Sequence, residues 1–249
     1  MKLGARGVTV ITASGDDGVL IPPARQNQSW NGLGPCAYIP EWTDSSPWIT
    51  VVGATQGHEL PHATLAQVVA CQSDMGGGIT TGGGFSERIP RPSYQDEAVQ
   101  KYLLSSEGRE AHPGFNSMGR GYPDVAMVGH SFVIVAGNES SVGSGTSVSA
   151  PIFAGFISLI NARRKEQGMQ SVGFINPRLY SALGGSSVAG GSSAAFTDVV
   201  SGWNHCAAGH NVSSVVCCAQ GFHASAGWDP LTGVGEPRSW QALAALFGL

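Results

Sequence analysis

Ser147, in a glycine-rich segment, is the residue of this sequence best placed to do chemistry. It follows Gly143 and Gly145 and precedes Pro151 and an apolar run of small residues. The glycines allow a close approach, and the run to Lys165 has an apolar face at helical spacing, so we expect a hydroxyl group at a helix N-terminus. Free N–H groups and the helix dipole could stabilise an oxyanion there. The alternative is a serine that only caps a buried helix.

Two aspartates form the second candidate group. The run from Gly7 to Gly15 is rich in β-branched residues and predicts a short strand buried on both faces, followed by a turn with Asp16 and Asp17. Chemistry in open α/β sheets collects at such strand ends. Asp16 is therefore a candidate site residue. The alternative is a turn aspartate that caps backbone amides, and Asp17 could take either role.

Strand and helix patterns alternate along the chain and would position these residues. We expect a single α/β domain over residues 1–249, with a mainly parallel sheet flanked by helices. Pro151 is expected near the first turn of the central helix. The expected elements are the end of a helix at 1–6, strands at 7–15, 48–55 and 131–136, a turn at 122–126, and helices at 96–106, 147–165, 176–183 and 237–246.

Composition restricts the partners. The net charge is −4 and only 12% of the 249 residues are charged, so no basic stripe is available for nucleic acid. No apolar run is long enough to span a membrane, and the first residues lack the apolar core of a signal peptide. We therefore expect neither a nucleic-acid partner nor a membrane span.

Other features favour a secretory or lysosomal protein. Asn27, Asn138 and Asn211 each begin a glycosylation acceptor pattern. Three of the five cysteines lie together at positions 206, 217 and 218, and an odd count leaves at least one thiol unpaired. Reduced cysteines in a cytosolic protein are the alternative.

Several loop segments carry further signals. The glycine runs 76–78 and 82–84 would let another backbone lie alongside, as an extended peptide does, although such runs also form flexible linkers. The long loop 19–47 contains Cys36 and would cover or carry a site. His58, His62 and Cys71 lack the spacing of metal ligands, and we expect the histidines in loops or at the surface.

Ser147 lies in a Gly-Thr-Ser-x-x-x-Pro pattern that subtilases and sedolisins share. None of the seven histidines has the His-Gly-Thr setting of a subtilase, and Asp16 stands where a subtilase carries an amide residue. The chain resembles the sedolisin family of serine-carboxyl peptidases, in particular its lysosomal tripeptidyl peptidase branch. The similar segments are 81–86, 90–95, 122–126, 173–180 and 227–230.

The resemblance implies a subtilisin-like fold and an acid peptidase. Ser147 would attack the scissile carbonyl, and a protonated Asp16 would stabilise the tetrahedral oxygen. In the family, a glutamate oriented by an aspartate is the general base, which suits an acidic compartment. The substrate would be a peptide or unfolded protein, cleaved after its N-terminal tripeptide. The residues expected to bind it are Gly82, Gly83, Gly84 and Ser86.

The chain departs from the family pattern in one respect. The family's glutamate and aspartate lie upstream of the Ala-Ser-Gly-Asp turn, and no Glu precedes Asp16 here. The resemblance implies that the chain is the C-terminal portion of a catalytic domain, monomeric and lysosomal or secreted. The alternatives are a catalytically inactive remnant that binds peptides or regulates a full-length relative, and a subtilase.

The resemblance also implies a calcium site at about 196–235. Asp198 and Asp229 would supply carboxylates, and the carbonyls of Val199, Ser225 and Gly227 would complete an all-oxygen cage. The family has a glycine where Ser225 stands. The alternative is two turn aspartates. A disulfide from Cys36 to one of the cysteines at 206, 217 or 218 would tie the first loop to this region, with the partner left open.

Overall fold

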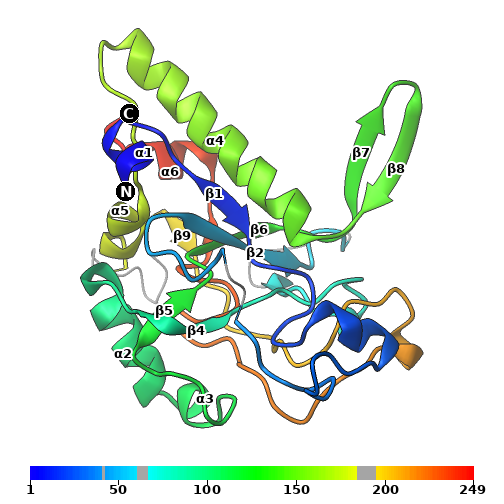
Figure 1. Cartoon of the computed structure of the whole chain (residues 1–249). Coiled ribbons are helices and arrows are strands. Elements are labelled where there is room, and N and C mark those ends of the chain that lie inside the picture. The colour runs from blue at the N-terminus through cyan, green and yellow to red at the C-terminus, as the bar shows by residue number, and fades with distance from the viewer. Residues whose placement is uncertain (41–42, 61–66, 184–194) are drawn as a thin grey trace.

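A four-stranded sheet forms the centre of the computed structural model, which describes residues 1–40, 43–60, 67–183 and 195–249 (Figure 1). Strand β2 (Thr50–Gln56) is fully buried and central. Strands β1 (Ile11–Ala13) and β6 (Val125–Val128) run parallel to its first and second halves, and β3 (Val69–Ala70) pairs antiparallel with its end. The expected α/β class with a mainly parallel sheet is confirmed.

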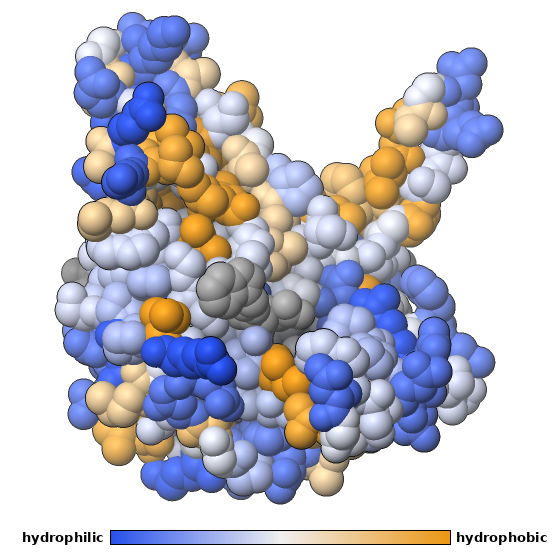
Figure 2. All heavy atoms as spheres, viewed as in Figure 1, coloured by the Kyte–Doolittle hydropathy of each residue, from blue (hydrophilic) through white to orange (hydrophobic). Residues whose placement is uncertain are grey.

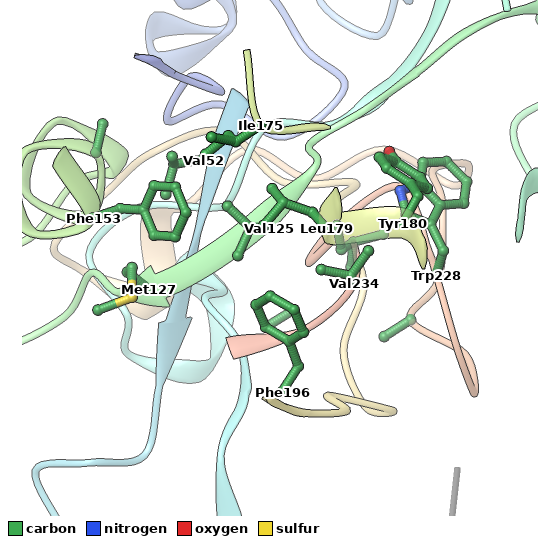
Figure 3. Packing of buried hydrophobic residues seen from close by; sticks show 14 of the residues in the cluster. Val52, Val125, Met127, Phe153, Ile175, Leu179, Tyr180, Phe196, Trp228 and Val234 are labelled. Atoms are coloured by element: carbon green, nitrogen blue, oxygen red, sulfur yellow. The ribbon is translucent and has the colours of Figure 1, made fainter. Parts of the chain in front are cut away.

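Helix α4 (Thr146–Glu166) packs against β1, β2 and β6. Phe153 of α4 is fully buried and lies beside Val52 of β2 and Met127 of β6 (Figure 3). Leu179, Phe196 and Trp228 belong to the same cluster of buried side chains, so segments from the whole length of the chain meet in one core. This core fixes the helix that carries Ser147 against the sheet.

The remaining elements surround this core. The helices are α1 (Lys2–Ala5), α2 (Asp96–Leu104), α3 (Ser106–Arg109), α5 (Asn176–Ser181) and α6 (Trp240–Ala245). Short 3₁₀ turns are η1 (Pro22–Gln26), η3 (Ser73–Met75), η4 (Ser93–Gln95) and η5 (Val212–Ser214). Antiparallel pairs join β4 (Gly84–Pro90) to β5 (Gly119–Tyr122), and β9 (Phe196–Thr197) to β10 (Glu236–Pro237).

One strand of the sheet was assigned wrongly from the sequence. The strand expected at 131–136 is β7 (Phe132–Ala136), whose partner strand among the described residues is β8 (Glu139–Gly143), in a hairpin that projects from the body (Figure 1). The sheet contains β6 instead, which begins in the last two residues of the predicted turn at 122–126 and continues to Val128. Val133 and Val135 are 60% and 72% exposed, so the apolar run reflected a hairpin rather than a core strand.

Smaller corrections concern burial and helix ends. Strand β1 is half-buried rather than buried on both faces, because it pairs with β2 along one edge and its other edge has no partner strand among the described residues. Pro151 lies inside α4 rather than at its first turn, and has no N–H to donate to the carbonyl of Ser147. Helix α6 begins at Trp240 rather than at Pro237. Pro237 belongs to β10, where it pairs with Phe196 of β9. His62 lies outside the described residues.

Two disulfides hold the long loop and the C-terminal region. Cys36 is bonded to Cys218 and Cys206 to Cys217, and Cys71 is a buried free thiol. The expected link from Cys36 to this region is confirmed, and its partner is Cys218. Within the described residues, no helix combines the length and the apolar character needed to cross a membrane.

A buried ion pair lies next to the sheet. Arg120 of β5 and Asp124 are fully inaccessible, and Nη2 of Arg120 donates to Oδ2 of Asp124 at 2.6 Å. The N–H of Val51 and the hydroxyl of Tyr180 also donate to this carboxylate, at 2.8 and 3.0 Å. The pair therefore joins β2, β5 and α5. Asp124 and Tyr180 lie in the motif segments 122–126 and 173–180, so these two segments have a structural role in the fold.

His58 gives the chain a pH-dependent contact. Its Nε2 lies 3.0 Å from Oε2 of Glu236, whose hydrogen bond raises the pKa of His58. This stabilisation is fully present below about pH 6.5, the ordinary His value, and is lost as the pH rises above the folded-state pKa. We expect His58→Gln to lower the free energy of unfolding by at most about 1 kcal/mol at pH 5 and by less at pH 8.

Urea unfolding at the two pH values measures this effect. His210→Gln, a change at an exposed histidine, is the matched control and should not alter the pH dependence. An equal loss of stability at pH 5 and pH 8 in His58→Gln would contradict the contact.

Candidate active site

Ser147 stands at the start of the central helix. Strand β8 ends at Gly143 and α4 begins at Thr146, so Ser147 lies in the first turn, with its side chain exposed. The N-cap position is Gly145, which has no side chain to cap the helix. Ser147 Oγ makes no hydrogen bond to any residue in the described ranges. The hydroxyl is thus presented at a helix N-terminus, and capping is not its role.

Asp16 provides the acceptor for this helix from a distant part of the chain. The N–H and Oγ1 of Thr146 both donate to its Oδ1, each at 2.8 Å. The N–H of Thr80 donates to the main-chain carbonyl of Asp16 at 2.9 Å. The carboxyl group is therefore held in one orientation by α4 and its backbone by the neighbouring segment.

Asp16 and Ser147 face the same small space. A Cβ added to Gly145 would lie 2.8 Å from Oγ of Ser147 and 3.5 Å from Oδ2 of Asp16. Because Oδ1 already accepts two hydrogen bonds, the proton of the acid form belongs on Oδ2, which borders this space. The structure thus brings together a hydroxyl and a carboxyl that could face one reacting carbonyl, and the catalytic roles of the two residues stay predictions.

Asp17 has a different environment. Its carboxylate accepts two hydrogen bonds of 2.7 Å from the guanidinium of Arg25, and one of 2.9 Å from the N–H of Ala208. Asp17 is 5% exposed. These contacts give Asp17 a structural role. They link η1 and the segment after Cys206 to the turn that carries Asp16.

Apolar hollows border Ser147 on two sides. One, of about 350 Å³, lies between the hairpin and α4, and the other, of about 430 Å³, lies between β1 and α4. Figure 2 shows apolar surface along the stem of the hairpin and on the body facing it. Such surface beside Ser147 suits an apolar polypeptide segment. The first hollow is lined by Phe132, Ile134, Val148, Pro151 and Ile152, and the second by Ile11, Thr12, Ala13, Ala150, Pro151 and Ala154.

The glycines expected to bind substrate are buried among the chain's own backbone. A Cβ on Gly82 would lie 1.8 Å from the carbonyl oxygen of Ser14, and one on Gly83 would lie 1.7 Å from that of Pro230. The Gly82 N–H donates to Gly15 at 2.8 Å, which places this segment beside the Asp16 turn. Close packing within the chain therefore accounts for these glycines.

Gly84 and Ser86 are also engaged within the chain. The Tyr38 hydroxyl lies 2.3 Å from the Cβ position of Gly84. The buried Oγ of Ser86 accepts a 3.0 Å hydrogen bond from the N–H of Ile89. A substrate contact by Gly82, Gly83, Gly84 or Ser86 stays a prediction.

The five residues expected to bind calcium lie together. The N–H of Gly227 donates to Oδ2 of Asp198 at 2.8 Å, and the N–H of Ser225 donates to Oδ2 of Asp229 at 3.2 Å. Thr232 Oγ1 is 3.5 Å from the carbonyl oxygen of Val199 and also contacts Asp229. The turn at 225–232 is thereby joined to the strand end at 198–199.

The electrostatics of these carboxyls favour a cation. Burial raises the pKa of Asp198 to about 6 and that of Asp229 to about 8. Asp198 Oδ1 is buried without a hydrogen-bond partner. Two desolvated carboxyls near each other, one with an unused acceptor oxygen, fit an all-oxygen site for a divalent cation.

The role of Thr146, which links Asp16 to α4 through two hydrogen bonds, was not predicted from the sequence. The hairpin that borders Ser147 was not predicted either. The threonine of the Gly-Thr-Ser pattern was a usable signal for the first, because a threonine at the first helical position offers both an N–H and a hydroxyl donor. No local signal existed for the second, because the apolar pattern of β7 also fits a core strand.

Curated relatives match almost the whole chain, and no family model matches it. Tripeptidyl-peptidase 1 of Bos taurus is 38% identical over 239 residues, which are 96% of this chain. The Homo sapiens and Mus musculus proteins of the same name are 38% and 37% identical over 240 residues. The chain spans 37% of the length of these relatives.

A solved structure gives the fold. Pseudomonas sedolisin, a serine-carboxyl proteinase complexed with pseudo-iodotyrostatin, superposes with a TM-score of 0.65 at 24% identity, covering 97% of this chain and 56% of that one. Over the matched region, the chain is thus similar in sequence to tripeptidyl-peptidase 1 and in fold to sedolisin. The α/β sheet with α4 across it is therefore the sedolisin fold, and Ser147 and Asp16 stand in the Gly-Thr-Ser and Ala-Ser-Gly-Asp segments that carried the resemblance.

Proposed function

We propose that this chain carries the nucleophile and the oxyanion-stabilising acid of a serine-carboxyl peptidase that cleaves peptide bonds at acidic pH and releases N-terminal tripeptides. The observation that carries the proposal is the space beside Gly145, which Ser147 Oγ and Asp16 Oδ2 both border. The similarity to tripeptidyl-peptidase 1 supports the tripeptide product.

Ser147 and Asp16 have different roles in the proposed reaction. Ser147 Oγ attacks the scissile carbonyl, and the protonated Oδ2 of Asp16 donates to the oxygen that becomes negative. The hydrogen bonds from Thr146 to Oδ1 hold the carboxyl ready, so no reorientation is needed during the reaction. Only the neutral acid can donate, which is why the proposed activity requires an acidic medium.

We propose that the general base comes from polypeptide that this chain does not contain. The relatives extend well beyond the matched region. The edge of β1 that has no partner strand in the described parts of the chain, and the two apolar hollows beside Ser147, offer a surface for such a segment. A serine without its base keeps only the residual rate from oxyanion binding and positioning.

Release of a fluorogenic group from a tripeptide-amide at about pH 4 to 5, the range of carboxyl pKa values, tests this function. The assay compares the chain alone with the chain joined to the N-terminal part of a sedolisin-type catalytic domain. We expect hydrolysis in the joined protein only. No hydrolysis in either, with both folded, would contradict the peptidase and favour the second candidate, a remnant that binds peptides without cleaving them.

We propose that Asp198, Asp229 and the carbonyls of Val199, Ser225 and Gly227 bind calcium, which would neutralise the two buried carboxyls. We expect saturating calcium to raise the Tm by about 5–10 °C over a chelated sample, since a ligand at 100 times its Kd stabilises by about 2.7 kcal/mol. Thermal unfolding with and without chelator measures the shift.

Asp229→Asn should remove most of the calcium effect. Asp96→Asn, which changes an exposed carboxylate outside the site, is the control and should retain it. An identical Tm in calcium and in chelator would count against the site.

We propose a lysosomal or secreted, glycosylated monomer. The asparagines of the three acceptor patterns, Asn27, Asn138 and Asn211, are all exposed, and the disulfides suit an oxidising compartment. Digestion of the protein from its native source with a peptide N-glycosidase should lower its mass, and an unchanged mass would exclude N-glycans.

A further inference from the structure

His130, which has no part in the chemistry described above, lies beside the turn that leads to Ser147. Its Nδ1 is 2.8 Å from the carbonyl oxygen of Gly77 and 2.9 Å from Oγ of Ser144. A carbonyl oxygen can only accept, so the contact with Gly77 requires the ring proton on Nδ1. Nε2 is then left to Ser131 Oγ, 3.1 Å away.

The turn of Ser144 and Gly145 is bound to the segment around His130 by two further hydrogen bonds. The N–H of Ser131 donates to Oγ of Ser144 at 3.3 Å, and the N–H of Gly145 donates to the carbonyl of Gly129 at 2.8 Å. Residues 129–131 thus lie alongside residues 144–145. Gly145 is the residue that borders the space between Ser147 and Asp16, so a shift of this turn would alter that space.

His130 also reaches a third segment, the glycine run 76–78. A Cβ on Gly78 would lie 3.5 Å from Cβ of Ser144, so this run packs directly against the turn. The imidazole is only 18% exposed, and its Nε2 lies 4.0 Å from Oε1 of Glu59. One ring therefore spans the end of β6, the glycine run and the turn before α4.

We propose that His130 is a positioning residue of the peptidase site, which fastens the turn of Ser144 and Gly145 to Gly77 through its Nδ1–H. It acts through Ser144 and sets where Ser147 Oγ stands relative to Asp16. The effect on catalysis rests on the proposed function, whereas the tether itself rests on the contacts of His130.

Amide hydrogen exchange at Gly145 and Thr146 tests the tether without any substrate. We expect His130→Ala to speed exchange at these two amides about tenfold, the effect of losing one hydrogen bond from a local opening. We expect His130→Asn, whose side-chain N–H₂ can stand in for Nδ1–H, to restore the slow rate. His112→Ala, at a ring that packs against Tyr38 instead, is the control and should leave both amides unchanged.

Three results would overturn the proposal. Exchange at both amides could stay within twofold of the parent in His130→Ala, it could rise equally throughout the chain, or Asn could fail to restore it. The second of these would mean that the histidine only supports the fold in general.

A double-mutant cycle gives an independent check. If His130 acts through Ser144, the pair His130→Ala and Ser144→Ala should exchange no faster than the faster single variant, whereas independent additive effects would contradict the tether. In a hydrolysing form of the protein, His130→Ala should lower kcat with little change in KM. Absence of hydrolysis in the chain joined to the N-terminal part of a sedolisin-type catalytic domain would refute the proposed function and leave the exchange result standing.

Discussion

Replacing Asp124 with asparagine is expected to lower the free energy of unfolding by about 3–5 kcal/mol, because it leaves the buried guanidinium of Arg120 without its counter-charge. Both side chains are fully inaccessible. In the variant, Arg120 Nη2 would no longer donate its 2.6 Å hydrogen bond to a charged carboxylate. Asparagine has nearly the same shape, so packing changes little and the loss reports on charge. Urea unfolding measures it.

Two controls separate the buried pair from ordinary contacts. Tyr180→Phe removes the 3.0 Å hydrogen bond to Asp124 and the one that the hydroxyl accepts from Gln95, and should cost about 1–3 kcal/mol. Lys101→Ala breaks an exposed pair with Glu97 on α2 and should cost less than about 0.5 kcal/mol. If Asp124→Asn proved no more harmful than Lys101→Ala, the buried pair would not stabilise the fold.

Ser147→Ala is expected to reduce hydrolysis by a factor of roughly 10⁶ in a hydrolysing form of the protein, since the change removes the proposed nucleophile. The side chain is exposed and makes no hydrogen bond in the described parts of the chain, so the Tm should not change. Initial rates on a tripeptide-amide, together with thermal unfolding, measure both effects. Cleavage at the parent rate by the alanine variant would remove Ser147 from the mechanism.

Asp16 variants examine the other half of the site. Asp16→Ala should lower kcat by roughly 10² to 10³, the usual effect of removing one oxyanion donor. Asp16→Asn keeps an N–H donor that needs no proton from the medium, so its activity should fall less steeply as the pH rises. A pH–rate profile identical to that of the parent would argue against Asp16 as the acid.

The elements predicted well from the sequence are those with long, uniform patterns. Helix α4 and strand β2 were placed within two residues of each end. Strand β6 was missed because it has only four residues directly after a Pro-Asp turn signal, whereas β7 next to it has the stronger apolar pattern. The pattern of β7 records an exposed hairpin, which no periodicity rule separates from a buried strand.

Only those residues of the candidate site that lie in sequence motifs were predictable. The Gly-Thr-Ser and Ala-Ser-Gly-Asp segments identified Ser147 and Asp16, but the hydrogen bonds from Thr146 to Asp16 join residues 130 positions apart. Likewise, His130 carried no motif, and its contact with Gly77 depends on how three loops meet. Gly82 and Gly83 show the opposite case, in which the signal for close approach was correct and the backbone that packs against both glycines is the chain's own.

The Cys36–Cys218 disulfide spans 182 positions of the sequence, and it affects how damage to the molecule would be detected. A protease that nicked the chain at the projecting tip near Gly137 would leave two pieces joined by that one covalent bond. Electrophoresis without a reductant would show a single species of unchanged mass. Only a reduced sample would reveal the break, so an apparently intact preparation can contain a severed connection between β7 and the helix that carries Ser147.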